Sequence, residues 1–169
     1  MTVNPESFRQ TMSRFASGIT VVTAKTRDGA PVGVTVSAFS SLSLTPPLIL
    51  ACLDNATANL DAYTEGPGFC VNILAAGQEE ASNAFAFPGP VSPFERIDNV
   101  DGALGIPILT GTVATLECTR FAVYPGGDHQ ILIGQVEHAA WRTDAAPLLY
   151  AAGGYRALAG PSAGPDVPA

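Results

Sequence analysis

The sequence predicts a single β-rich α+β domain built around a small antiparallel β-barrel. Short segments rich in β-branched residues are separated by turn signals, hairpin connections predominate, and strands and helices do not alternate as in βαβ units. A barrel is the expected closure because it leaves no exposed strand edge. The 169 residues fit one domain, which we place at 1–159, with a Gly/Pro/Ala-rich tail at 160–169 that we expect to be disordered.

The chain is expected to open with a helix and a β-hairpin. Asn4-Pro5-Glu6 has the form of an N-cap, a first-turn proline and an acidic first turn. The helix that follows is ended by Gly18, and its one apolar face consists of Phe8, Met12, Phe15 and Ala16. Residues 19–24 then predict a strand, and Asp28-Gly29 predicts a hairpin turn.

The returning strand of this hairpin, expected within residues 33–48, carries many small hydroxyl side chains among apolar ones. Two interpretations are open. The hydroxyls belong either to a solvated strand face or to a surface that hydrogen-bonds a polar ligand. These residues are Thr35, Ser37, Ser40, Ser41, Ser43 and Thr45.

The remainder of the chain predicts further strands with two short helices. Pro46-Pro47 breaks the preceding strand, and residues 87–111 are loop-rich, which at about 25 residues indicates a functional or mobile segment. A Gly126-Gly127-Asp128 turn joins two of the later strands. The expected strands are 48–53, 69–74, 112–121, 129–141 and a short one within 147–152, and the expected helices are 57–63 and 77–85.

Composition argues against two classes of partner. The formal net charge is −7 and no basic run occurs, so we expect no nucleic-acid partner. No apolar run approaches the about 20 residues that span a bilayer, so we expect no membrane insertion. Charged residues make up only 14% of the chain, which favours a surface partly covered by another subunit.

The three cysteines, Cys52, Cys70 and Cys118, lie far apart in apolar runs and form no C-x-x-C pair. We interpret them as small hydrophobic residues of buried strands. Together with an N-terminus that lacks the basic and apolar regions of a signal peptide, this predicts a cytoplasmic protein.

Standard motifs of catalysis are absent from the sequence. There is no dinucleotide-binding glycine motif, P-loop or nucleophile elbow, and the two histidines lack neighbours of metal-site spacing, so no metal site is expected. His129 is either an exposed turn residue or a hydrogen-bond donor or proton source beside a ligand. Asn55-Ala56-Thr57, expected just before a helix, either caps that helix or binds an anion.

Five segments in order carry a resemblance to a known family. The chain resembles the flavin reductase-like domain family, the small reductase components of two-component flavin-dependent monooxygenases, from about Phe8 to Leu158. The matching segments are FRQTMSRFASGITVVTA, PVGVTVSAFSSLSLTPPLILACLD, FCVNILAAGQEEASNAFA, LECTRFAVYPGGDHQILIGQV and PLLYAAGGYRAL. The resemblance implies a split β-barrel, usually homodimeric, that binds FMN or FAD and reduces it with NADH or NADPH. Reduced flavin then passes to a separate monooxygenase.

The resemblance also assigns residues to the site. The positions expected to bind flavin are Thr35, Val36, Ser37, Ala38, Ser41, Cys52, Leu53, Asn55, Thr57, Phe85 and Tyr155. Within this set, residues 35–38 match the edge of the isoalloxazine ring, and Asn55 with Thr57 matches the pair that holds the phosphate. His129, in Gly-Gly-Asp-His, matches the histidine placed near the nicotinamide and is the catalytic candidate.

Two departures and one rival function accompany the resemblance. Ala38 stands where the family often has Ser, and Pro93-Phe94 stands where a basic residue commonly precedes Phe, so Arg96 or Arg14 is the candidate cation for the phosphate. Hydride transfer needs little acid–base machinery, in keeping with the absent motifs. The rival is a flavin-binding carrier, sensor or subunit without turnover. An oxidase like the pyridoxamine-phosphate oxidases would be expected to carry more than eight basic residues.

Overall fold

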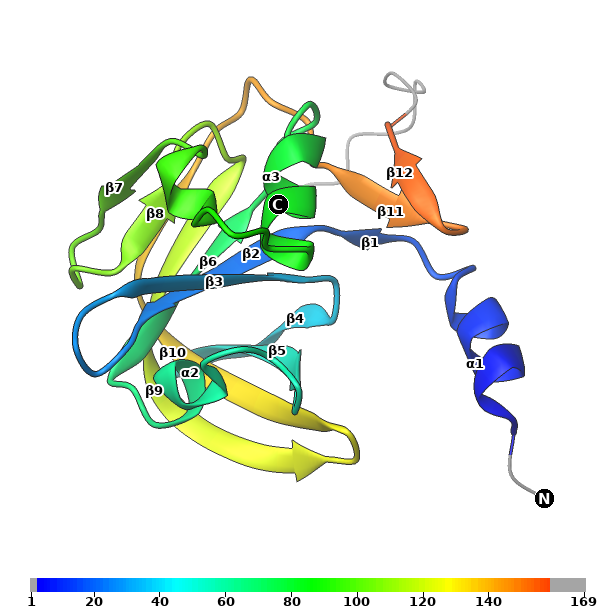
Figure 1. Cartoon of the computed structure of the whole chain (residues 1–169), viewed down its shortest axis with the longest axis horizontal. Helices are drawn as coiled ribbons and strands as arrows, with labels where there is room; N and C mark the ends of the chain where they lie inside the picture. The colour runs from blue at the N-terminus through cyan, green and yellow to red at the C-terminus, as the bar shows by residue number, and fades with distance from the viewer. Residues whose placement is uncertain (1–2, 159–169) are drawn as a thin grey trace.

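The computed structural model describes residues 3–158, which form a β-rich structure around one large antiparallel sheet (Figure 1). Its strand order is β3-β2-β6-β9-β10-β5-β4. The bounds are β2 Thr20–Lys25, β3 Pro31–Val36, β4 Phe39–Leu44, β5 Pro47–Asp54, β6 Gly68–Ile73, β9 Ala114–Gly126 and β10 His129–Trp141. Every pairing within this sheet is antiparallel, as the hairpin-rich sequence predicts.

Smaller elements surround the large sheet. A three-stranded sheet consists of β1 Ser17–Gly18, β11 Leu149–Ala151 and β12 Gly154–Arg156, and a hairpin consists of β7 Asn99–Asp101 and β8 Pro107–Leu109. The helices are α1 Pro5–Met12, α2 Leu60–Thr64 and α3 Glu79–Ala86, with a 3-10 turn, η1, at Pro93–Glu95. No helix within residues 3–158 has the length and apolar character that crossing a membrane requires.

Only Ser37 and Ala38 separate β3 from β4, although these strands are the two opposite edges of the large sheet. Because two residues span only a short distance, the sheet must curl until its edges meet beside this link. The Cys52 N–H of β5 donates to the Ala38 carbonyl at 2.9 Å. The ladder itself does not close within residues 3–158, since β3 and β4 are terminal in the strand order.

The link also corrects the expectation of one strand within residues 33–48. The structure splits this segment into β3, which pairs with β2, and β4, which pairs with β5. Tight reversal at residues 45–46 folds β4 back along β5, so the hydroxyl-rich stretch lies on two different edges. The single-strand prediction was wrong because a change of pairing partner leaves no mark on local periodicity.

Two hydrophobic clusters fill the interior. One lies inside the curled sheet and includes Val22, Leu53, Phe69 and Leu132, with Tyr63 of α2 packed against them. The second lies between the sheet and α3 and is formed by Ile19, Val21, Leu74, Ala81, Phe85, Leu109 and Leu148. Neighbouring residues of β2 therefore point into different clusters, as the period of a strand requires.

One fully buried amide ties three strands together. Asn72 of β6 is 0% exposed, and its Nδ2 donates to the Val21 carbonyl at 3.0 Å and to Thr23 Oγ1 at 3.3 Å. Its Oδ1 accepts from the Leu109 N–H at 2.8 Å. Since an unpaired buried polar group is costly, these bonds fix β2, β6 and β8 relative to one another.

The predicted start of the first helix is confirmed, but the helix ends at Met12 rather than at Gly18, so Phe15 and Ala16 follow it, and its apolar side chains are uncovered in the single chain. Asn4 Oδ1 accepts from the Ser7 N–H at 2.8 Å, and α1 begins at Pro5. Phe8, Met12 and Phe15 are 59%, 50% and 72% exposed. Figure 1 shows α1 standing apart from the large sheet, so no described element covers this face.

Other expectations met mixed outcomes. The strand 129–141 is confirmed, while the expected helix at 57–63 begins later, at Leu60. Residues 87–111 are more ordered than predicted: Glu117 accepts from the Ala103 and Leu104 N–H groups and so holds the β7–β8 turn. The sequence prediction also missed β12. The expected tail at 160–169 lies outside the described residues.

The cysteines divide into two groups. Cys70 and Cys118 are buried, as predicted, and burial raises the pKa of each thiol to about 12. Cys52 is only half-buried. None of the three forms a disulfide within the described chain.

Candidate functional site

Two cavities at the end of β3 adjoin the Ser37-Ala38 link, and a groove of about 450 Å³ adjoins it from the side of Met12 and Phe15. The smaller, about 170 Å³, lies between the end of β3 and the end of β5. The larger, about 370 Å³, lies between β3, α3 and the β11–β12 hairpin. Thr35 and Ser37 line both cavities. The predicted site residues that line the smaller cavity are Thr35, Val36, Ser37, Ala38, Cys52, Leu53, Thr57 and His129.

The link presents unpaired polar groups to these cavities. Within residues 3–158, neither the Ser37 N–H nor the Ala38 N–H donates to a protein acceptor, and the Ser37 hydroxyl makes no hydrogen bond. The Ala38 carbonyl, in contrast, is occupied by the Cys52 N–H. A ligand with acceptor atoms along a planar edge can therefore bond to two consecutive amides here.

Thr35 has a different environment from its neighbour Ser37. Its hydroxyl donates to the Ser82 carbonyl of α3 at 2.6 Å and so ties the end of β3 to that helix. The hydroxyl proton is used within the protein, which leaves the Thr35 oxygen as an acceptor only. Ser37 is the hydroxyl that remains free at the link.

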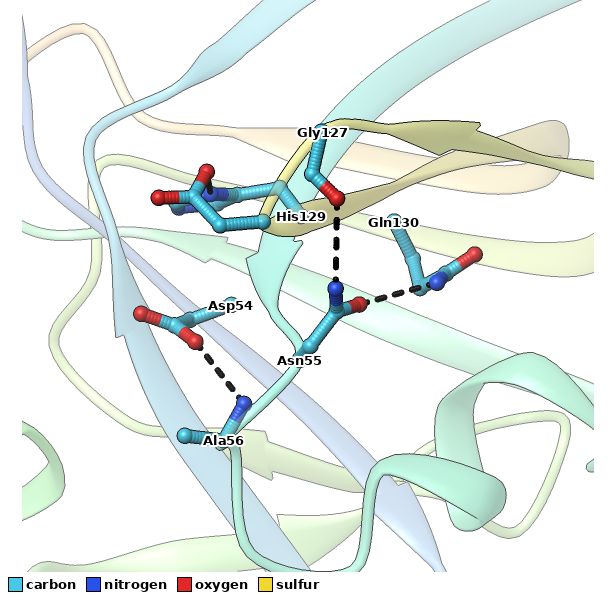
Figure 2. A network of polar contacts seen from close by, with 7 residues as sticks. Asp54, Asn55, Ala56, Gly127, His129 and Gln130 are labelled. Carbon is cyan, nitrogen blue, oxygen red and sulfur yellow. Dashed lines mark hydrogen bonds and ion pairs between the residues drawn. The ribbon is translucent and has the colours of Figure 1, made fainter.

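Asn55 connects the end of β5 to the β9–β10 turn, as Figure 2 shows. Its Oδ1 accepts from Gln130 Nε2 at 2.8 Å, and its Nδ2 lies 3.4 Å from the Gly127 carbonyl. Its backbone N–H donates to the Asp128 carbonyl at 2.9 Å. The expected helix N-terminus directly after residues 55–57 is wrong, because α2 starts five residues beyond Asn55. Anion binding by that helix end is therefore not available.

His129 stands at the mouth of the smaller cavity and is paired with Asp128. The His129 Nδ1 lies 2.7 Å from Asp128 Oδ1. This hydrogen bond, together with the nearby ring, lowers the pKa of the Asp128 carboxyl below its ordinary value. With Nδ1 occupied, Nε2 is the ring nitrogen left for a ligand, as an acceptor in the neutral ring and as a donor in the protonated ring.

Four predicted residues lie outside the smaller cavity. Ser41 is exposed on β4 and pairs with Ile49 of β5, and the side chain of Asn55 is engaged as described. Phe85 is 2% exposed and packs edge-to-face on Phe94, with ring centroids 5.0 Å apart. Tyr155 lines the larger cavity, where its hydroxyl lies 2.8 Å from Asn83 Oδ1. The ligand contacts assigned to all of these residues stay predictions.

Sequence reasoning missed several cavity residues. Ser82 and Asn83 of α3 and Tyr150 of β11 line the larger cavity, and Asp54 lines the smaller one. Two polar residues beside the apolar positions of the helix at 77–85 were the only local signal for Ser82 and Asn83. Within residues 3–158, no cluster of His, Cys, Asp and Glu could hold a metal ion.

Comparison with known proteins points to one family. A model of the flavin reductase-like domain matches residues 12–159. The chain is 40% identical over 158 residues to the reductase component of 4-hydroxyphenylacetate 3-monooxygenase from Thermus thermophilus, covering 93% of this chain and 99% of that one. It is 38% identical over 152 residues to an FMN reductase (NADH) from Agrobacterium fabrum, covering 90% and 85%. The structure of an NADH:FAD oxidoreductase from Streptomyces globisporus, in complex with NAD and FAD fragments, superposes with a TM-score of 0.87 at 36% identity, covering 95% of this chain and 98% of that one.

Proposed function

The chain belongs to the flavin reductase-like domain family, and we propose that it is an NADH-dependent flavin reductase. It transfers a hydride from NADH to FMN or FAD and supplies reduced flavin to a separate monooxygenase. The observation that carries this proposal is the pair of unpaired amides at Ser37 and Ala38, two residues that line the smaller cavity.

The residues of the smaller cavity fit a flavin. The amides of Ser37 and Ala38 are suited to the polar edge of the isoalloxazine ring, and the end of β5 at Cys52 and Leu53 borders the same cavity. Thr57 also lines this cavity, and we assign its hydroxyl to the flavin phosphate. Bound flavin supplies the electron-accepting chemistry, so the protein has chiefly to bind and orient.

His129 is the residue we assign to the reductant side. Its Nε2 faces away from the Asp128 contact and can hydrogen-bond a nicotinamide amide or a reduced ring. Asp128 keeps Nδ1 as the protonated nitrogen and thereby fixes which face of the imidazole is presented. No general base or nucleophile is required, because hydride transfer moves no proton from a side chain.

We further propose that the curled sheet is the split barrel of the family and that the chain is a homodimer. The apolar face of α1 supports the dimer, as does a groove of about 450 Å³ between α1 and the β4–β5 edge, lined by Met12, Phe15, Phe39 and Leu50. A second copy would cover both. Light scattering after size exclusion tests this, and Phe15→Glu is expected to shift the mass to that of one chain. The unpaired cysteines support a cytoplasmic location.

The reductase proposal is tested by anaerobic assay of NADH and NADPH with FMN, FAD and riboflavin. We expect NADH oxidation that rises with added free flavin, which marks flavin as a diffusible substrate. Tight flavin binding without NADH or NADPH oxidation would contradict the proposal and favour the carrier function. NADPH preference would change the donor while leaving the reaction in place.

A further inference from the structure

We propose that Gln130 is a positioning residue, which acts through Asn55 to fix the turn that carries His129. The proposal deepens the proposed function, on which it rests. Gln130 Nε2 donates to Asn55 Oδ1 at 2.8 Å across 75 residues of sequence. Gln130 is not among the residues that line the smaller cavity, whereas His129 is.

Asn55 is attached to the β9–β10 turn at three successive points around His129. Its backbone N–H bonds to Asp128, its Nδ2 lies 3.4 Å from the Gly127 carbonyl, and its Oδ1 accepts from Gln130. Of residues 127–130, only His129 has no hydrogen bond to Asn55. Since neighbouring strand residues point to opposite sides, the Gln130 side chain lies on the side of its paired residue Leu53, whereas His129 lies on the side of Asp54 and lines the cavity. Figure 2 shows the two side chains on opposite sides of Asn55.

His129 has little else to hold its ring. The side chain is 39% exposed, and its one hydrogen bond among the described residues goes to Asp128, whose own side chain is 90% exposed. Gly127, in the middle of the turn, has a φ of 76°, a conformation that only glycine adopts readily. The ring therefore stays in place only if the backbone of the turn does, and the Gln130–Asn55 bond restrains that backbone.

The Gln130–Asn55 hydrogen bond also connects the two ends of the proposed site. Asn55 is followed by Thr57, at the phosphate end, and is bonded to the turn that presents His129, at the reductant end. Loss of the Gln130 bond frees the Asn55 amide to rotate and loosens the Gly127 contact with it. We therefore expect the defect to appear in the use of NADH rather than in flavin affinity.

The test uses Gln130→Met, which keeps the length of the side chain and removes its donor. At saturating flavin, kcat/KM for NADH is expected to fall about 10-fold, as for a modest misplacement of a positioned group. The matched control is Gln135→Met, on the same strand, whose amide contacts Glu137 at 3.4 Å and not Asn55; no loss is expected there.

A double-mutant cycle with His129→Ala tests whether the effect of Gln130 on NADH use depends on His129. If Gln130 acts through His129, Gln130→Met should cost less than about two-fold once His129 is absent. Equal losses in both backgrounds, no loss in Gln130→Met, or a similar loss in Gln135→Met would overturn the proposal.

A readout that does not depend on turnover separates this inference from the proposed function. The chain has two histidines, so their ring protons can be assigned in a one-dimensional NMR spectrum by comparison with His129→Ala. The His129 signal should shift or broaden in Gln130→Met while His138 stays unchanged. An unchanged His129 signal overturns the positioning role. Failure of the wild-type chain to oxidise NADH overturns the proposed function alone.

Discussion

The interior around Asn72 and the cavity mouth around Asn55 use the same side chain in two different environments. Each asparagine joins segments far apart in the sequence through both its oxygen and its nitrogen. Asn72 is completely buried, whereas Asn55 is exposed. Water can replace a lost bond at the mouth but not in the interior, so the first network governs stability and the second governs position.

The contrast extends to the backbone. Interior strands have their amides paired in the ladder, while Ser37 and Ala38 have amides with no acceptor within residues 3–158. Unpaired amides are tolerated there because the link is open to solvent through two cavities. Unpaired backbone amides, rather than polar groups as such, therefore mark the candidate site; the one buried side-chain group without a partner in residues 3–158, the Tyr63 hydroxyl, lies in the interior.

Thiol reactivity gives the largest expected difference between the two regions. Burial raises the pKa of Cys70 and Cys118 to about 12, so at pH 8 their thiolate fraction is about 1000-fold lower than that of an ordinary cysteine. A chromogenic disulfide reagent should react quickly with Cys52 alone, and with the others only after unfolding. Saturating flavin should protect Cys52. Rapid reaction of all three thiols in the native protein would remove the contrast.

Paired alanine substitutions compare the two asparagines directly. Asn72→Ala leaves the Leu109 N–H and its other partners unpaired in the interior and should lower the free energy of unfolding by about 3 kcal/mol. Asn55→Ala, at an exposed position, should cost less than about 1 kcal/mol. Urea unfolding followed by circular dichroism measures both. Similar losses would show that exposure does not separate the two networks.

His129→Ala tests the role of the cavity mouth in NADH use and leaves the interior network around Asn72 unchanged. We expect kcat/KM for NADH to fall about 10- to 100-fold, because a positioned hydrogen-bonding group is lost, with flavin affinity changed less than about two-fold. Steady-state kinetics and flavin titration measure the two quantities. Unchanged kinetics would remove His129 from the site.

Thr57→Ala should have the smallest effect and locates the phosphate end. Loss of one hydroxyl should weaken FMN binding by about 10-fold or less, while riboflavin, which lacks the phosphate, should bind nearly as before. Thr64→Ala, in α2 and outside both cavities, is the matched control. An equal loss for both flavins would place Thr57 away from the phosphate.

Local signals account for what the sequence predicted correctly. The Asn4-Pro5 helix start, the Asp28-Gly29 turn and the strand 129–141 depend on neighbouring residues, and each is found in the structure. The resemblance selected most residues of the smaller cavity, because they lie in the continuous segments 34–38 and 52–57.

Long-range pairing accounts for what the sequence did not reveal. The split of segment 33–48 follows from a change of partner strand, and the Gln130 partner of Asn55 lies 75 residues away. Phe85 is a suitable aromatic by residue type, yet its burial depends on Phe94 and on Gly33, where an added Cβ would lie 2.6 Å from the Phe85 ring. Such contacts require the assembled fold.

The Ser37-Ala38 link has a consequence for the lifetime of the protein. Ser37 and Ala38 line the smaller cavity only when the two edge strands of the sheet, and hence all the strands between them, are in place. A flavin bound there recognises the folded chain alone, so occupancy favours the folded state by mass action, by about 2.7 kcal/mol at a hundred times Kd. The supply of flavin would then govern how long each molecule escapes proteolysis, as well as how fast it works.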